Sequence, residues 1–389
     1  MLIDGPVNIV RIEGKINNID KILYIFFDQH NPVVEQTQCD SYESVNITKF
    51  LYNIFKNISR KLDFFLEIRT EQFKHYDISN YNKMYIHENI KLYNKIKNHK
   101  FKNTRLHYLD IRDILLKGVN DSFNWFVFND PLHDVRNSKI LYYDIFTNYL
   151  YHIKNLKKRI LFIESILINI KNNDKYKSKL KSLIPNGKKN IEQSINYIIY
   201  KLYYRYNHED TFYKFKKSYT EQILDQIIVC LDYIDKIIDL LMKNQKFLNN
   251  KDKIYFKDLN KLNNLYSEHK YTIIDSIIND LDYLTSRFRN NILSLFVLIT
   301  DLFFIRRFID KDYIQFTITY TGGTHSINYI YNLIKYFDFK ITNASYSDIS
   351  IDELNIMAKK DNIYNFGYQL ETIHNDQCSN ITTFPKEFL

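Results

Sequence analysis

Apolar side chains near the start of the chain first follow a two-residue period and then form an unbroken run. Residues 5–13 alternate between apolar and polar positions, and residues 22–27 are all apolar. Gly14 and an Asn-Asn pair lie between them, so the pattern predicts a hairpin or two neighbouring strands. Since the second strand is apolar on both faces, we expect helices to cover both sides of its sheet.

A helix and two further strands are predicted next. Apolar residues recur at helical spacing over residues 45–60, and residues 62–68 form a second buried run. Strand, helix and strand within this distance are typical of a βαβ unit with parallel strands. Residues 105–111 predict another short strand.

The central part of the chain predicts long helices. Apolar residues repeat every three or four positions over three segments, residues 139–170, 223–241 and 273–304. This period is typical of helices that bury one face. Pro185-Asn186-Gly187 is the clearest interruption.

Strand character returns after the helical section. Residues 314–318 alternate, residues 327–336 have a helical period, and residues 337–342 predict a further strand. The fold class is therefore α/β: a mixed or parallel sheet core flanked by helices, with a large helical insertion between its N- and C-terminal halves. The predicted parts are the N-terminal half of the core, the insertion, the C-terminal half and a tail without strong signal, at residues 1–139, 140–305, 306–360 and 361–389.

Composition and charge narrow the class of protein. Of the 389 residues, 45% are hydrophobic and 25% charged, which is typical of globular chains. The net charge of +9 is spread along helices with acidic residues between the basic ones, which favours a solvated surface over a nucleic-acid patch. The most apolar segment, residues 292–304, contains Asp301 and precedes Arg306. It therefore predicts a buried helix and no membrane span.

The cysteines and the first residues bear on the cellular compartment. Cys39, Cys230 and Cys378 lie far apart and form no Cys-x-x-Cys motif. An odd number without a pairing framework favours a reducing compartment. The first ten residues lack the basic and apolar regions of a secretion signal, so we expect an intracellular protein.

Polar residues follow the predicted strands at their C-terminal ends, where open α/β sheets place their sites. The first apolar run leads to Asp28 and His30, the second ends at Glu67, and the third ends at Asp110 and Arg112. Each one alone is more typical of a helix cap or a solvated loop. Together they indicate a shared site, with Asp28, Glu67, Asp110 and Arg112 as candidate catalytic residues.

Two adjacent glycines, Gly322 and Gly323, follow the late strand in a chain that has only 7 glycines. They predict a backbone that passes close to another group or has a positive φ, although a plain tight turn explains them equally well. We take them as candidate cofactor-binding residues. His325 then lies near the start of the next helix, whose dipole would lower the histidine pKa and keep the ring neutral.

Neutral imidazoles with a carboxylate nearby suit a divalent metal ion. Asp28 and His30 form an Asp-x-His pair, and His30 and His325 are the candidate ligands for Mn, Fe, Co or Zn. Arg289 and Asn290 lie on the helix before the last strands, where they would clamp an anionic or carbonyl group. On their own, these two residues are more typical of a surface.

The order of these motifs resembles that of uncharacterised proteins from giant DNA viruses of the mimivirus type. In that pattern a Gly-Pro pair, an Asp-x-His motif, a cysteine, a strand ending in Glu, a Tyr-x-Asp-x-Arg-Asp segment and a late His-Ser pair follow one another. The matching positions here are Gly5-Pro6, Asp28 to His30, Cys39, Glu67, Tyr108 to Asp113 and His325-Ser326. Phe27 departs from the pattern, which often has Gly at this position.

Both ends of the chain also resemble, over shorter motifs, the TraB/TIKI group and the wider erythromycin-esterase/ChaN-like fold. Gly322 to His325 matches the second Gly-x-x-His motif of that group, and Arg289-Asn290 matches its Arg-Asn pair. His30 matches the first motif without its glycine. In that group the two histidine motifs face each other, and some members are metal-dependent peptidases. The resemblance therefore implies that the two motifs of this chain also face each other.

Two functions are therefore expected. In the first, the protein is a metal-dependent hydrolase in which His30 and His325 hold the metal and Glu67 or Asp28 activates water. In the alternative, it is a non-enzymatic, virion-associated or host-interacting protein on a degenerate hydrolase fold. Either function places the protein in the host cytoplasm or the virion, with a protein or the virion as partner. Nucleic-acid binding would rest on charge alone and is not expected.

Overall fold

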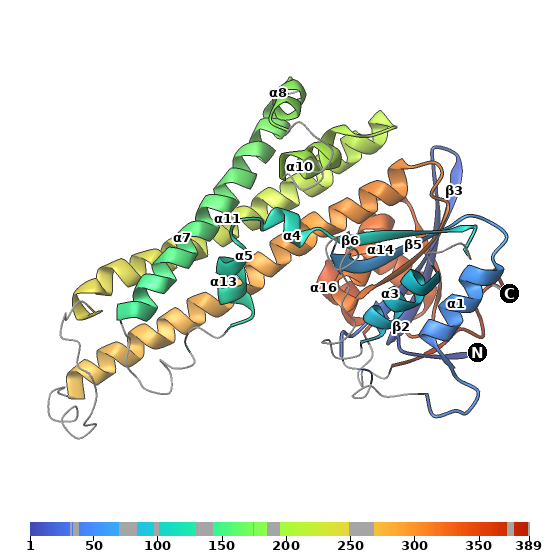
Figure 1. Ribbon diagram of the computed structural model, residues 1–389, viewed down its shortest axis with the longest axis horizontal. Coiled ribbons are helices and arrows are strands. Elements are labelled where there is room, and N and C mark those ends of the chain that lie inside the picture. Colours follow the sequence, from blue (N-terminus) through green and yellow to red (C-terminus); the bar gives the residue numbers. More distant parts are fainter. Residues whose placement is uncertain are drawn as a thin grey trace. The chain divides into compact units, whose positions relative to one another are not determined.

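The protein consists of two compact units (Figure 1). The computed structural model describes residues 1–31, 33, 39–69, 84–96, 101–129, 132, 143–173, 175–184, 195–248, 268–371 and 377–387. The first unit comprises residues 1–111, 205–214 and 300–389, and the second comprises residues 112–204 and 215–299. The sequence predicts a helical insertion at residues 140–305, between the two halves of the core.

A six-stranded sheet forms the centre of the first unit. Its order is β6-β5-β7-β3-β2-β8. The strands are β2 (Asn8–Ile16), β3 (Ile19–Asp28), β5 (Leu62–Arg69), β6 (Thr104–Asp110), β7 (Phe316–Gly322) and β8 (Lys340–Ala344). The four strands from β6 to β3 are parallel, whereas β2 is antiparallel to both of its neighbours. The predicted α/β class with a mixed sheet is therefore confirmed.

The late strand β7 lies between two strands from the start of the chain. It pairs with β3, where Asp28 is opposite Gly322, and with β5, where Leu66 is opposite Tyr320. The predicted βαβ unit thus has parallel strands β3 and β5 that are separated by β7. The position of β7 thus brings the C-terminal ends of the early strands β3 and β5 beside that of the late strand β7, as the sequence predicted.

The turn between β2 and β3 follows from two asparagines. Asn17 and Asn18 have φ values of 49° and 64°. Asparagine tolerates this left-handed conformation better than most residues, and two such residues in succession form the turn that matches the twist of a hairpin. The predicted hairpin is confirmed.

Helices cover both faces of the sheet. Side chains such as Tyr24, Phe26 and Phe64 point to one face and pack with α1 (Ile47–Asn57) and α3 (Tyr85–Ile96). On the other face lie α14 (Gly323–Phe337) and the last turns of α13 (Glu268–Asp310), where Phe65 contacts Phe304 with ring centroids 5.0 Å apart. The β3 residues are therefore buried on both sides, as their apolar run indicated.

A smaller sheet joins the beginning of the chain to its tail. It contains β1 (Leu2–Asp4), β4 (Val45–Asn46) and β9 (Cys378–Asn380), with β1 in the middle. A disulfide links Cys39 to Cys378, 339 residues apart in sequence. This pairing could not be predicted from the sequence, because neither cysteine belongs to a recognisable motif. Two helices follow β8 in sequence, α15 (Ile351–Lys360) and α16 (Ile363–Tyr368), and the second lies in the predicted tail.

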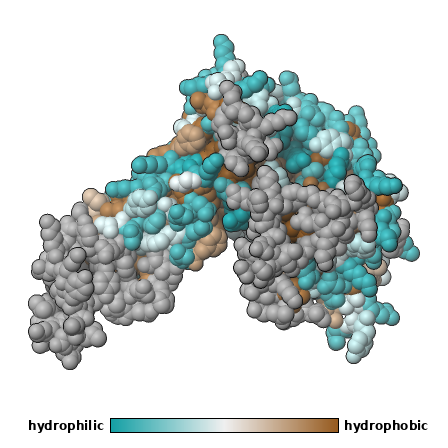
Figure 2. All heavy atoms as spheres, in the orientation of Figure 1, coloured by the Kyte–Doolittle hydropathy of each residue, from teal (hydrophilic) through white to brown (hydrophobic). Residues whose placement is uncertain are grey.

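The second unit is helical. Its elements are α4 (Arg112–Leu115), α5 (Asn120–Val127), α7 (Tyr143–Asn172), α8 (Tyr176–Ser182), α10 (Ile195–Tyr204), and most of α11 (Glu209–Leu248) and α13. Ile227 and Ile234 of the predicted stripe are fully buried, whereas Ile228 is exposed. In the described part of the chain, no helix combines the length and apolar character needed to cross a bilayer. Hydrophilic and apolar side chains are interspersed over the described part of the visible surface (Figure 2).

Candidate functional site

His30 lies immediately beyond β3 and turns back toward the end of its own strand. Its φ of 56° is left-handed, and its backbone N–H donates to Asp28 Oδ2 at 3.2 Å. The ring nitrogen Nδ1 lies 2.5 Å from the same oxygen. The other oxygen of Asp28 accepts a hydrogen bond of 2.8 Å from the Tyr320 hydroxyl. Asp28 is therefore a buried anchor for the His30 ring.

His325 has a similar anchor on the other side of the site. It lies in the first turn of α14, and its Nδ1 is 2.5 Å from Asp301 Oδ1 on α13. Asp301 is fully buried, and its second oxygen accepts a 2.6 Å hydrogen bond from Asn328. Since His325 and Asn328 are three residues apart on one helix, both reach the same carboxylate.

Glu67 joins the two imidazoles. It lies near the end of β5, next to β7, where its Oε2 accepts a 2.7 Å hydrogen bond from the Gly322 N–H. His30 Nε2 lies 3.4 Å from Oε2, and His325 Nε2 lies 3.3 Å from Oε1. Two carboxylate-anchored histidines thus converge on one glutamate. We call Asp28, His30, Glu67, Asp301 and His325 the histidine cluster.

Glycine is required at position 322 by the close approach of the cluster. A Cβ atom there would lie 2.8 Å from His30 Nε2 and 3.4 Å from Glu67 Oε2. The φ of Gly322 is −57°, so a positive φ is not the reason for this glycine. A Cβ at Gly323 would meet nothing within 4 Å. Close approach to the cluster therefore explains the glycine at position 322. Neither close approach nor a positive φ explains Gly323.

Positively charged imidazoles alternate with negatively charged carboxylates in the histidine cluster. Burial alone would lower the pKa of both histidines, but the neighbouring carboxylates outweigh it. Asp28 and Glu67 raise the pKa of His30 to about 10, and Glu67 and Asp301 raise that of His325 well above its ordinary value. Burial would raise the pKa of Glu67, yet the two imidazoles hold it well below its ordinary value. The expectation of a neutral His325 is therefore wrong, because two carboxylates act on this ring more strongly than the helix dipole.

The members of the cluster differ in their access to solvent. The side chain of His30 is 41% exposed, whereas those of Glu67 and His325 are each 8% exposed. Both aspartates are buried completely. His30 is therefore the group that an external molecule can reach most easily.

The other predicted site residues lie elsewhere. Asp110 ends the edge strand β6, and its carboxylate accepts from Arg69 Nε at 3.4 Å. Arg112 begins α4 in the second unit. Arg289 and Asn290 also belong to that unit, where Arg289 donates to two backbone carbonyls, with Asn290 exposed. The structure thus brings together Asp28, His30, Glu67, Gly322 and His325 from the predicted set.

The contacts of the candidate metal ligands are hydrogen bonds and ion pairs within the histidine cluster. Asp28 is a hydrogen-bond partner of His30, so the predicted Asp-x-His ligand pair is not arranged for shared coordination. The two Nε2 atoms contact different oxygens of Glu67. Among the described residues, no group of three or more His, Cys, Asp or Glu side chains is arranged to hold a metal ion. Metal binding stays a prediction from the sequence.

Sequence reasoning missed Asp301, which anchors His325, and Asn328, which donates to the same Asp301 carboxylate. In the sequence, Asp301 argues only against a membrane span. A lone aspartate within the apolar segment 292–304 did carry a signal, because a charge in a buried helix requires a partner. The sequence did not indicate which partner it had.

Comparison with known proteins identifies relatives along the whole chain. A family of unknown function, DUF5847, matches residues 1–389. The uncharacterized protein R706 of Acanthamoeba polyphaga mimivirus is 31% identical over 417 residues, which covers 100% of this chain and 97% of the relative. The uncharacterized protein R161 of the same virus is 30% identical over 444 residues, which covers 99% of this chain and 98% of the relative. The chain therefore belongs to the DUF5847 family.

The resemblance to giant-virus proteins is thereby confirmed. No solved structure matches the chain significantly. The resemblance to the TraB/TIKI group and the erythromycin-esterase/ChaN-like fold thus receives no support from known structures.

Proposed function

We propose that the first unit is a hydrolase in which the histidine cluster transfers protons. The observation that carries the proposal is the contact of one carboxylate, Glu67, with Nε2 of both imidazoles, while a buried aspartate holds each Nδ1. A carboxylate on Nδ1 fixes an imidazole and stabilises its charged form, as in histidines that act as general acids and bases. In this proposal the protonated ring of His30, whose pKa is raised, is the proton donor, and Glu67, which its lowered pKa keeps ionised, is the acceptor.

The proposed proton cycle uses the contact between His30 and Glu67. Glu67 takes a proton from water while the water oxygen forms a bond to the carbonyl carbon of an ester or amide. His30 gives its Nε2 proton to the departing oxygen or nitrogen as the bond to carbon breaks. The proton then passes from Glu67 to His30 over the 3.4 Å contact, which restores both groups. His325, fixed by Asp301, keeps Glu67 oriented and ionised.

Two adjacent glycines provide a matched test. Gly322→Ala places a methyl group 2.8 Å from His30 Nε2, whereas Gly323→Ala meets no atom within 4 Å. With a panel of p-nitrophenyl esters and peptide p-nitroanilides, we expect Gly322→Ala to lose about 10²–10⁴-fold in rate, the usual contribution of general acid–base catalysis. Gly323→Ala should keep the wild-type rate. Absence of hydrolysis by the wild type, or equal rates in the two variants, would overturn the proposal.

Metal content separates this proposal from the metal-dependent hydrolase that the sequence predicted. Hydrolysis by the proton cycle persists after dialysis against a chelator, and the purified protein carries no stoichiometric divalent ion. Stoichiometric Mn, Fe, Co or Zn that disappears in both His30→Ala and His325→Ala would favour the metal-dependent alternative.

A protein-binding role is the second candidate, favoured by the surface of the helical unit. Helix α7 exposes four large apolar side chains, Tyr151, Leu161, Phe162 and Ile168. Exposed apolar side chains that gather on one element are typical of binding surfaces. Tagged protein from infected cells should then retain a stoichiometric partner that Phe162→Glu releases. Retention of the same partner by this variant would contradict the role.

A further inference from the structure

An apolar cavity lies beside the central sheet in the first unit, apart from the residues of the histidine cluster. Its volume is about 220 Å³. Ile9, Tyr24, Phe26 and Phe50 line it on the side of the core. Ile381 and Phe384 line it from residues 381–387, which follow β9 and which we call the strap. The strap therefore forms one wall of the cavity.

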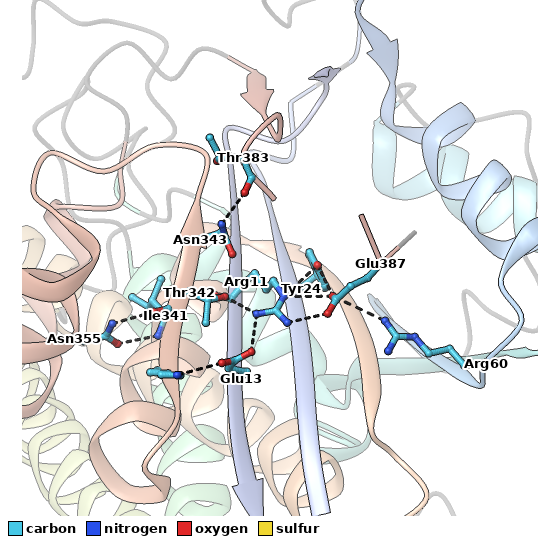
Figure 3. A network of polar contacts seen from close by, with 11 residues as sticks. Arg11, Glu13, Tyr24, Arg60, Ile341, Thr342, Asn343, Asn355, Thr383 and Glu387 are labelled. Carbon is cyan, nitrogen blue, oxygen red and sulfur yellow. Dashed lines mark hydrogen bonds and ion pairs between the residues drawn. The ribbon is translucent and has the colours of Figure 1, made fainter. Parts of the chain in front are cut away.

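A partly buried carboxylate site adjoins this cavity at Tyr24. The Tyr24 ring lines the cavity, and its hydroxyl donates to Glu387 Oε2 at 2.6 Å. Arg11 Nη2 donates to Glu387 Oε1 at 2.9 Å, and Arg11 Nε lies 3.3 Å from Oε2. Arg60 approaches the same carboxylate at 3.9 Å from the other side (Figure 3). Two guanidinium groups and a phenol thus surround the carboxylate at the end of the strap.

The carboxylate site is built into the sheet independently of the strap. Arg11 is only 4% exposed, and it also binds Glu13 at 2.9 Å and Thr342 at 2.6 Å. These contacts hold the guanidinium with one edge directed to Glu387. A two-point contact of this kind suits any carboxylate, since the planar guanidinium matches its two oxygens.

We propose that the cavity binds a carboxylic acid with an unbranched alkyl chain of about six to eight carbons. The alkyl chain occupies the apolar cavity, and the carboxylate takes the place of Glu387 against Arg11, Tyr24 and Arg60. A dry cavity of about 150 Å³ is large enough for benzene, so a cavity of about 220 Å³ has room for such a chain. Glu387 then acts as an internal competitor, and the strap moves when the ligand enters.

Chain length and head group each make a separate prediction. Every buried methylene adds about 0.8 kcal/mol, which is about a fourfold gain in affinity. Affinity for the protein should therefore rise by about fourfold per carbon from butyrate to octanoate and then stop rising for longer acids. Octan-1-ol, with the same chain and no charge, should bind at least about tenfold more weakly than octanoate, because a hydrogen bond to a charged group is the stronger one.

Calorimetric titration of the full chain with octanoate tests the proposal. We expect one site in the wild type and about tenfold tighter binding in Glu387→Gln, because the internal competitor loses its charge. Glu371→Gln, an exposed position outside the strap, is the matched control and should bind as the wild type does. Ile9→Phe fills the cavity and should abolish binding; Ile381→Phe does the same from the strap if the first variant fails to fold.

Three results would overturn the inference. The first is no binding of octanoate by either the wild type or Glu387→Gln. The second is equal affinity for octanoate and octan-1-ol, which would exclude the carboxylate site. The third is unchanged binding in a folded cavity-filling variant, which would place the ligand elsewhere.

Discussion

Replacing Glu67 with glutamine removes the charge on which both imidazoles converge and keeps the size of the side chain. The Gly322 N–H still requires an acceptor, so the amide oxygen takes the position of Oε2. The amide NH₂ group then faces His325 Nε2, which must lose its proton to accept a hydrogen bond. Glu67→Gln should therefore leave His325 neutral and break the central ion pairs of the cluster.

The expected cost is dominated by the buried pair. Glu67 and His325 are each 8% exposed, and breaking a buried ion pair costs about 3–5 kcal/mol. His30 is 41% exposed, so solvent screens its contribution and we add little for it. For a unit of this size, about 2–4 °C is lost per kcal/mol, which predicts a decrease in Tm of about 6–20 °C.

The pH dependence has a definite sign. The pKa of His30 is raised to about 10 and that of His325 is also raised, so their pairing stabilises the fold fully below the ordinary histidine value of about 6.5. The part due to His30 is lost as the pH rises through about 10, and the part due to His325 is lost as the pH rises through the raised pKa of that ring. The lowered pKa of Glu67 gives stability above about pH 4.5, which is lost as the pH falls through that lowered value.

Thermal unfolding of the wild type, Glu67→Gln and the exposed control Glu371→Gln at pH 6, 8 and 10 measures this effect. The difference in Tm between the wild type and Glu67→Gln should be largest at pH 6 and smallest at pH 10. The control should have the same Tm as the wild type at each pH. A Tm difference of the same size at all three pH values, or no difference at pH 6, would refute the reasoning.

Three further changes test other parts of the first unit. Asp301→Ala leaves Nδ1 of His325 without its acceptor and should destabilise the fold by about 2–4 kcal/mol, measured by urea unfolding; a loss under about 0.5 kcal/mol would show that the anchor is unimportant. Reduction of the Cys39–Cys378 disulfide should cost about 2–5 kcal/mol, measured as a decrease in Tm with reductant, and an equal Tm with free thiols by mass spectrometry would contradict it. Lys21→Met removes the ammonium that donates to three backbone carbonyls at and after the end of α13 and should cost about 3 kcal/mol, whereas an unchanged unfolding midpoint would mean that water replaces it.

Local patterns in the sequence predict most elements of the first unit, because burial imposes a period on each strand and helix. The alternation at 314–318 and the run at 22–27 correspond to β7 and β3. The two-residue strand β4 and the three-residue strands β1 and β9 are too short to show a period. Their pairing joins residues from both ends of the chain, which no local pattern reports.

The candidate site could likewise be predicted only in part. His30, Glu67 and His325 were predictable because they lie near or just beyond the C-terminal ends of strands, and parallel strands end at one edge of a sheet. The anchor of His325 was not predictable, since Asp301 comes from a helix and meets His325 only through packing in three dimensions. The charge of His325 was mispredicted for the same reason: the helix dipole can be inferred from sequence, whereas the two carboxylates next to the ring cannot.

The protonation of the imidazoles is the most direct test of the proposed cluster. Nitrogen NMR of protein labelled at histidine, with His30→Asn and His325→Asn used for assignment, reports at pH 8 whether each ring nitrogen carries a proton. We predict that both rings are doubly protonated in the wild type and that His325 is neutral in Glu67→Gln. Neutral rings in the wild type at pH 8 would contradict the alternating charges from which the proton cycle is derived.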